Sequence, residues 1–178
     1  MPSAPALVEE CTLPRLSVLD PAFVHAAYFQ DSYRAPLRRG HATPVDIFHG
    51  IFAHQPAWMK VVMVARNRLA SLWGIDAPTA AEIMRPVVRT NYAVGDKIGP
   101  WPIFALTDNE LVAGRDNKHL DFRLSVLRES SGQAASVVVS TVCLVHNSFG
   151  KLYLFCIVPL HKWGVRRLIK TAAMAGRL

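Results

Sequence analysis

The stretch WPIFALTDNELVAGRDNKHLDFRLSVLRES, residues 101–130, decides the fold, because apolar and polar residues alternate along much of it. A period of two is typical of strands, whose successive side chains point to opposite faces of a sheet. Turn residues such as Asp108–Asn109 interrupt the pattern, and short connections join antiparallel neighbours. We therefore expect antiparallel strands at 101–108, 109–116 and 118–130.

The same pattern continues towards the C-terminus. QAASVVVSTVCLVHN (133–147) and KLYLFCIVPL (151–160) are two further strand candidates, separated by a turn at Phe149–Gly150. Pro159 is expected to end the last strand, because proline cannot donate a hydrogen bond to a neighbouring strand. The remaining residues, 161–178, repeat apolar residues at helical spacing and basic residues four apart, which predicts an amphipathic, basic terminal helix.

The N-terminal half predicts a strand followed by two short helices. Residues 1–20 are rich in proline and small residues and are expected to be irregular, and 26–35 is the first strand candidate. Thr43 is a good N-cap for a helix that ends before Pro56. A second helix is expected at 57–73 and a short strand at 87–94.

This order predicts one α+β domain over residues 1–178. The expected architecture is a helix-grip: a curved antiparallel β-sheet of about six or seven strands around a long C-terminal α-helix, with two short helices after the first strand. An amphipathic helix laid across a concave sheet buries the apolar faces of both. A loose fit would leave an apolar pocket between them.

Three segments carry a family resemblance: HLDFRLSV, TVCLVHNSFGKLYL and VPLHKWGVRRLIKTAAMAG. They resemble the bacterial family of unknown function DUF2867, from about Tyr28 to the C-terminus. The chain has Leu160 where that family's proline-phenylalanine-histidine motif has its phenylalanine. The resemblance implies a START or Bet v 1-like (SRPBCC) helix-grip fold, and it implies no established reaction.

Composition limits the classes of function. The net charge is +7, but the basic residues form no dominant tract and no nucleic-acid-binding motif accompanies them, so nucleic acid is not an expected partner. No long uncharged apolar run and no secretory signal pattern are present, which predicts a cytoplasmic protein. Three cysteines without a CxxC or Cys/His cluster argue against a metal site, and no cofactor is expected.

Polar residues alternate along GRDNKHLDFRLSV (114–126), so Asn117, His119, Asp121 and Arg123 share one face of the expected strand. One interpretation pairs His119 with Asp121 as an oriented base and gives Arg123 an anionic ligand, as in a cyclase- or hydrolase-like enzyme. The other is an ordinary solvated face, which many antiparallel sheets have. A serine hydrolase is disfavoured, because Ser125 is not in a GxSxG turn.

The leading expectation is a protein that is not an enzyme, or not demonstrably one, and that binds a small hydrophobic molecule, lipid-like or polyketide-like, between sheet and terminal helix. A hydrophobic fraction of 51% suggests more apolar surface than one core hides. Large apolar side chains and a few polar groups typically line such pockets. The candidate ligand-binding residues are Trp58, Met63, Trp101, Phe104, Arg123, His146 and Tyr153.

Two interaction surfaces are alternatives to a ligand site. Residues 137–145 are apolar at both alternating positions, so the outer face of that strand could pair with a second copy of the chain in a homodimer. Trp163, with Lys162, Arg166, Arg167 and Lys170, has the composition of a helix that lies on a membrane surface. The same helix could instead expose its charges to water and pack on its own sheet.

Overall fold

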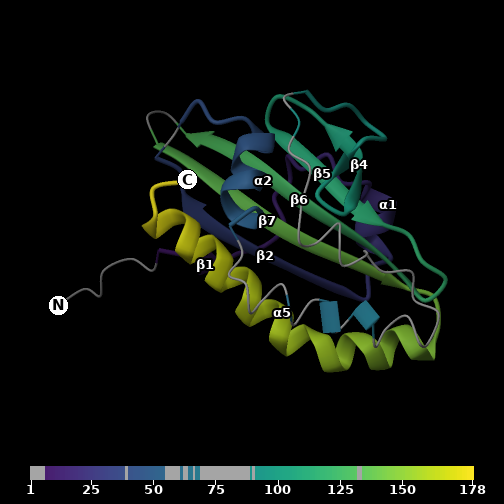
Figure 1. Cartoon of the computed structure of the whole chain (residues 1–178). Helices are drawn as coiled ribbons and strands as arrows, with labels where there is room; N and C mark the ends of the chain where they lie inside the picture. Colours follow the sequence, from purple (N-terminus) through teal and green to yellow (C-terminus); the bar gives the residue numbers. More distant parts are fainter. Residues whose placement is uncertain are drawn as a thin grey trace.

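The described part of the chain is built around one antiparallel sheet of seven strands, seen in the computed structural model in Figure 1. The structure describes residues 7–38, 40–54, 61, 64, 65, 67, 68, 89, 91–131 and 134–178. The strand order is β1-β2-β7-β6-β5-β4-β3. The strands are β1 (Glu9–Glu10), β2 (Phe29–Pro36), β3 (Lys97–Ile98), β4 (Trp101–Leu106), β5 (Glu110–Arg115), β6 (Leu120–Ser131) and β7 (Ala134–Val145).

The meander predicted from the alternating pattern is confirmed. Strands β4 to β7 follow one another as antiparallel neighbours, and β6 pairs with β7 from Leu120 opposite Val145 to Ser131 opposite Ala134. The N-terminal strands extend the sheet beyond β7. Strand β2 pairs with β7, and β1 pairs with β2 at the edge of the sheet. Residues far apart in the sequence therefore meet at the β2–β7 pair.

Helices α2 (Pro44–Phe52) and α5 (Ser148–Met174) cover one face of the sheet, which we call the inner face. Tyr33, Val126 and Val139 lie on this face and form one core with Ile47 of α2 and Ile169 of α5. In Figure 1, α5 runs along the sheet beside β2, and α2 lies on the same side. The long C-terminal helix packed on an antiparallel sheet is the α+β arrangement expected from the element order.

The N-terminal segment covers the opposite, outer face. Val112 of β5 and Val142 of β7 are buried there together with Leu19, and Phe23 of the short helix α1 (Pro21–His25) packs against them. This explains why β7 is apolar on both faces without a second copy of the chain. The outer face of β7, which the homodimer hypothesis required to be free, is covered at Val142 by the chain itself.

The segment predicted as a strand at 151–160 is helical, and this prediction was wrong. Helix α5 begins at Ser148 and continues through Pro159 to Met174. Its buried residues Leu154, Val165, Ile169 and Ala172 recur at helical spacing. Proline has no backbone N–H, so the carbonyl group one turn before it lacks its hydrogen bond within the helix. Pro159 lies on the exposed side, where that carbonyl can face water. The predicted turn at Phe149–Gly150 is the first turn of this helix.

The N-terminal predictions were partly correct. Thr43 caps α2 as predicted, in a reciprocal capping box with Asp46. Residues 9–10 form a strand within the segment expected to be irregular. The second helix predicted at 57–73 lies largely outside the described residues, as does 87–90 apart from Arg89, while 91–94 is not a strand. None of the helices in the described ranges has the length and apolarity needed to cross a membrane.

Candidate functional site

The polar face of β6 points away from α5. Arg123 places its guanidinium group 3.6 Å from the ring centre of Phe104 and 4.8 Å from that of Phe23 in α1, which covers the outer face. Asp121 is two residues away on the same strand and therefore shares that face. The charged face of this strand accordingly lies outside the layer between sheet and α5.

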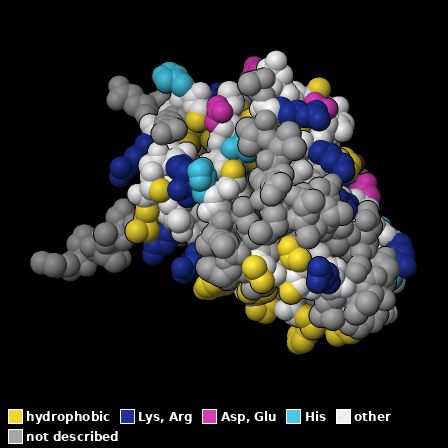
Figure 2. All heavy atoms as spheres, in the orientation of Figure 1, with side chains coloured by type: hydrophobic (Ala, Val, Ile, Leu, Met, Phe, Trp, Pro, Cys, Tyr) yellow, Lys and Arg dark blue, Asp and Glu magenta, His cyan; other side chains and the backbone are white. Residues whose placement is uncertain are grey.

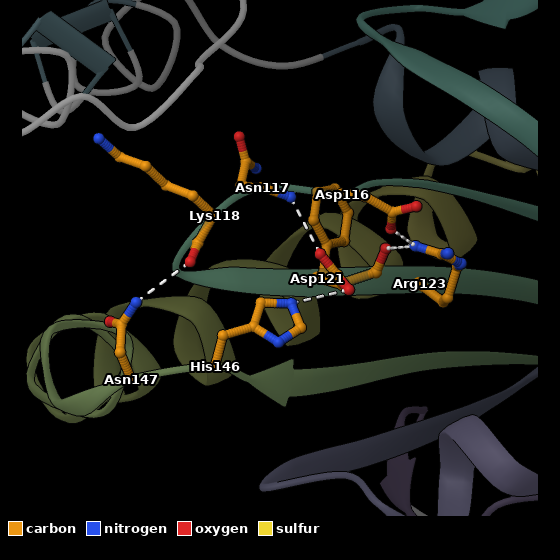
Figure 3. Close-up of polar contacts among 8 residues, drawn as sticks. Asp116, Asn117, Lys118, Asp121, Arg123, His146 and Asn147 are labelled. Carbon is orange, nitrogen blue, oxygen red and sulfur yellow. Dashed lines mark hydrogen bonds and ion pairs between the residues drawn. The ribbon is translucent and has the colours of Figure 1, made fainter.

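His119 and Asp121 do not form the predicted pair, because each has another partner. The carboxylate of Asp121 lies 2.9 Å from Nε2 of His146 and accepts a hydrogen bond from the backbone N–H of Asn117 (Figure 3). His119 instead lies with Nδ1 3.1 Å from the side-chain Nδ2 of Asn147. The dyad that motivated the enzymatic alternative is thus replaced by two separate contacts at the ends of β6 and β7.

Asn147, the partner of His119, is the N-cap of α5. Its Oδ1 accepts from the N–H of Gly150, and its Nδ2 donates to the carbonyl oxygen of Lys118 (Figure 3). The ring of Phe149 lies 4.8 Å from that of His119. These contacts anchor the start of α5 to the start of β6, which is a structural role.

The structure does not gather the candidate ligand-binding residues at one place. Trp101 packs edge-on against Phe48 of α2 on the inner side, whereas Phe104 and Arg123 meet on the outer face. His146 lies at the end of β7 and Tyr153 is half-buried on α5. Trp58 and Met63 lie outside the described residues.

A buried polar cluster that the sequence reasoning missed lies between β2 and α5. The side chain of Asp31 is 1% exposed, accepts a hydrogen bond of 3.2 Å from the hydroxyl of Tyr33, and lies 3.4 Å from Nε2 of His161. Tyr33 is fully buried, and burial together with the neighbouring Asp31 carboxylate raises its pKa well above the usual value. The tyrosine therefore stays protonated and serves as a donor to Asp31.

His161 brings the helix into this cluster. Its ring lies in a T-shaped arrangement with the ring of Phe29, at a centroid distance of 5.9 Å. Its Nε2 points to Asp31. Arg166, further along α5, has its guanidinium carbon 5.8 Å from the ring centre of Tyr33. A carboxylate, an imidazole and a phenol thus meet on an otherwise apolar inner layer.

Two residues of β7 complete the surroundings of Asp31. Thr141 is opposite Asp31 in the β2–β7 pair, is 6% exposed, and has a hydroxyl oxygen without a hydrogen-bond partner among the described residues. Cys143, two residues on, is buried, and burial followed by the charge of Asp31 raises its pKa to about 12. Cys143 is therefore a neutral thiol, and Thr141 is a polar group with unused hydrogen-bonding capacity.

The cluster offers hydrogen-bond donors and acceptors to a polar group but lacks the set of ligands that a metal site needs. Within the described ranges, no group of three or more His, Cys, Asp and Glu side chains is placed to hold a metal ion. Buried carboxylate and imidazole groups in contact are a pattern found at both functional and structural sites. The sequence holds one clue, since Asp31 and Tyr33 share one face of a strand with the apolar residues Phe29 and Ala35, but His161 is 130 positions away.

Fold and site together define an α+β protein in which a long C-terminal helix packs on an antiparallel sheet, with a buried Asp–His–Tyr cluster between them. The chain belongs to the DUF2867 family of proteins of unknown function, whose family model matches residues 23–168. The family membership predicted from the sequence is thereby confirmed. No curated protein sequence matches this chain.

Proposed function

We propose that the protein binds a small, largely apolar molecule between the inner face of the sheet and α5. The cluster of Asp31, Tyr33 and His161 would hold a polar group of that molecule. The observation that carries this proposal is the hydroxyl of Thr141, which is buried opposite Asp31 and has no partner among the described residues. A buried hydroxyl without a hydrogen bond is costly, and a ligand group that satisfied it would remove that cost.

The order of elements supports the same proposal. A sheet in which the first long strand pairs with the last, with the C-terminal helix packed on one face, agrees with the START or Bet v 1-like class implied by the resemblance. Fold alone does not determine function, so the argument depends on the cluster. The expected ligand is an aromatic or alicyclic molecule with one hydroxyl or carbonyl group, because the cluster is small and its surroundings are apolar.

Naphthalene and 1-naphthol test the proposal, because they share an apolar ring system and differ by one hydroxyl. Binding can be measured by fluorescence titration of the full chain. We expect 1-naphthol to bind more tightly, and we expect Thr141→Val to reduce that preference about tenfold, the effect of one lost hydrogen bond. Threonine and valine have nearly the same shape, so the substitution removes the hydroxyl and leaves the apolar volume.

Ser140→Ala is the matched control. Ser140 is adjacent on β7, and its side chain points to the outer face, where its hydroxyl is bonded to that of Ser32 at 2.8 Å. This variant should keep the preference for 1-naphthol. Failure of both probes to bind would refute the proposed function, whereas binding with equal loss in both variants would refute the role of Thr141.

A further inference from the structure

The outward side of α5 exposes large apolar side chains. Leu152 is 60% exposed, Phe155 80%, Leu160 47% and Trp163 48%. Figure 2 shows hydrophobic side chains gathered along the lower edge of the molecule, where α5 runs in Figure 1, with basic side chains among them. A soluble protein rarely leaves several large apolar residues contiguous on one helix without a function for them.

These residues form one stripe. Their spacing of three to five positions places them on one side of a helix with 3.6 residues per turn. The buried residues Leu154, Val165 and Ile169 fall on the opposite side, against the sheet. The stripe is therefore not needed for the contact between α5 and the sheet.

The charge of α5 has one sign. Its sequence from Ser148 to Met174 contains no aspartate or glutamate. Where the apolar stripe ends, the same outward side continues with exposed basic residues, and the guanidinium of Arg167 lies 5.4 Å from the ring centre of Trp163. The basic residues of the helix are Lys151, Lys162, Arg166, Arg167 and Lys170.

We propose that the outward side of α5 docks on an anionic lipid surface. Exposed aromatic and aliphatic side chains enter the boundary between head groups and acyl chains, while flanking basic residues bind the lipid phosphates. The chemistry of the partner is argued from charge complementarity, because α5 carries five basic residues and no acidic residue of its own, a composition that fits an anionic surface. The helix lies on the surface and does not cross it, since Lys162, Arg166 and Arg167 interrupt its apolar sequence.

A second copy of this chain is the competing occupant, and the charges argue against it. In a two-fold symmetric dimer the same patch meets itself, so α5 would pack on α5. Such a contact would bring together basic residues from both copies with no acidic residue of α5 to neutralise them. One of these cations, Lys162, already has an acidic neighbour within the chain, Glu10 at 3.3 Å.

Vesicle co-sedimentation of the full chain tests the proposal. We expect binding to vesicles of phosphatidylcholine with phosphatidylglycerol at low salt, little binding to phosphatidylcholine alone, and weaker binding at ~0.5 M salt, where charges are strongly screened. Phe155→Ser should reduce binding by about tenfold or more, because it removes the most exposed aromatic side chain of the stripe. Trp163 should show a blue-shifted emission on binding, and the shift should disappear in Trp163→Phe.

Leu16→Ser is the control, because Leu16 is 84% exposed but lies in the N-terminal segment and not on α5. It should bind vesicles like the unchanged chain. Absence of binding to anionic vesicles at low salt would overturn the proposal, and so would equal binding by the Phe155→Ser chain. A dimer in light scattering that Phe155→Ser dissociates, without vesicle binding, would assign the stripe to a second copy instead.

Discussion

Nε2 of His161 lies 3.4 Å from the carboxylate of Asp31, although the two residues are 130 positions apart. The contact joins α5 to β2 inside the inner layer, where apolar side chains dominate. Asp31 also accepts a hydrogen bond from the hydroxyl of Tyr33. One buried carboxylate therefore serves as the partner of two polar side chains. The stability of this layer should therefore depend strongly on Asp31.

Asp31→Ala should lower the free energy of unfolding by about 1 to 3 kcal/mol, because it leaves the buried hydroxyl of Tyr33 without its acceptor. Adding Tyr33→Phe should recover part of that loss by removing the orphaned hydroxyl. Asp116→Ala is the control, since Asp116 pairs with Arg123 at an exposed site and should cost less than about 1 kcal/mol. Urea unfolding measures all three, and equal costs at Asp31 and Asp116 would contradict the cluster.

Two glycines on α5 should respond oppositely to alanine. A Cβ at Gly150 would overlap the carbonyl oxygen of His119 and lie 2.9 Å from a methyl group of Val145, whereas a Cβ at Gly164 would meet open space. Gly150→Ala should therefore destabilise by about 1 to 3 kcal/mol. Gly164→Ala should stabilise by about 0.5 to 1 kcal/mol, because alanine favours a helix interior. Thermal unfolding measures both variants. A change in stability of the same sign in the two variants would contradict this packing.

The strands could be predicted from the sequence where local patterns decide them. Residues 101–130 alternate and are divided by turn residues, so their hydrogen-bonding neighbours follow from short connections. Residues 151–160 could not be assigned in this way, because leucine, tyrosine, phenylalanine, isoleucine and valine suit a buried strand as well as a helix. The helix follows from the cap at Asn147 and from burial at Leu154 and Val165, which require the tertiary structure.

The candidate site shows the same limit more strongly. Asp121 and His119 are close in sequence, which made them a candidate pair, yet Asp121 contacts His146, which lies diagonally across the β6–β7 pair and just beyond the end of β7. The Asp31 cluster depends on the position of α5 over β2, which no local pattern specifies. Family resemblance could be read from short segments, but the contacts of a buried carboxylate could not.

The cysteines should differ in reactivity. The pKa of Cys143 is raised from 9.0 to about 12, so its thiolate fraction near pH 8 should be about a thousandfold below that of an unperturbed thiol. Cys156 is exposed on α5. Iodoacetamide labelling followed by mass spectrometry should modify Cys156 first and Cys143 only after denaturation. Rapid labelling of Cys143 in the folded chain would show that the inner face beside Asp31 is open to solvent.

Acid should destabilise the chain through His49. Burial lowers the pKa of His49 below its usual 6.5, against a smaller opposing effect of Asp46. The unfolded chain therefore binds a proton more readily as the pH falls through about 6.5, and stability is lost in that range and regained at higher pH. His49→Gln should lose less stability between about pH 7.5 and 5.5, measured by urea midpoints. A larger loss in the variant would contradict the prediction.

Glu110 should hold the N-terminal segment on the outer face. It is 1% exposed, and its carboxylate accepts hydrogen bonds from the hydroxyls of Ser17 and Ser125 and from the backbone N–H of Val18. Glu110→Ala should cost about 2 to 4 kcal/mol, since hydrogen bonds to a charged group are strong and their donors would be left without an acceptor.

Hydrogen exchange should show which part of the chain loses stability in Glu110→Ala. Protection should be lost first at Val18 and Leu19, because Glu110 is the acceptor for the N–H of Val18 and Leu19 is buried over Val142. Glu129→Ala supplies the comparison: Glu129 pairs with Arg34 at 2.9 Å on a partly exposed site, and its removal should cost less than about 1 kcal/mol. Unchanged exchange at Val18 in the Glu110→Ala chain would mean that apolar packing alone retains the segment.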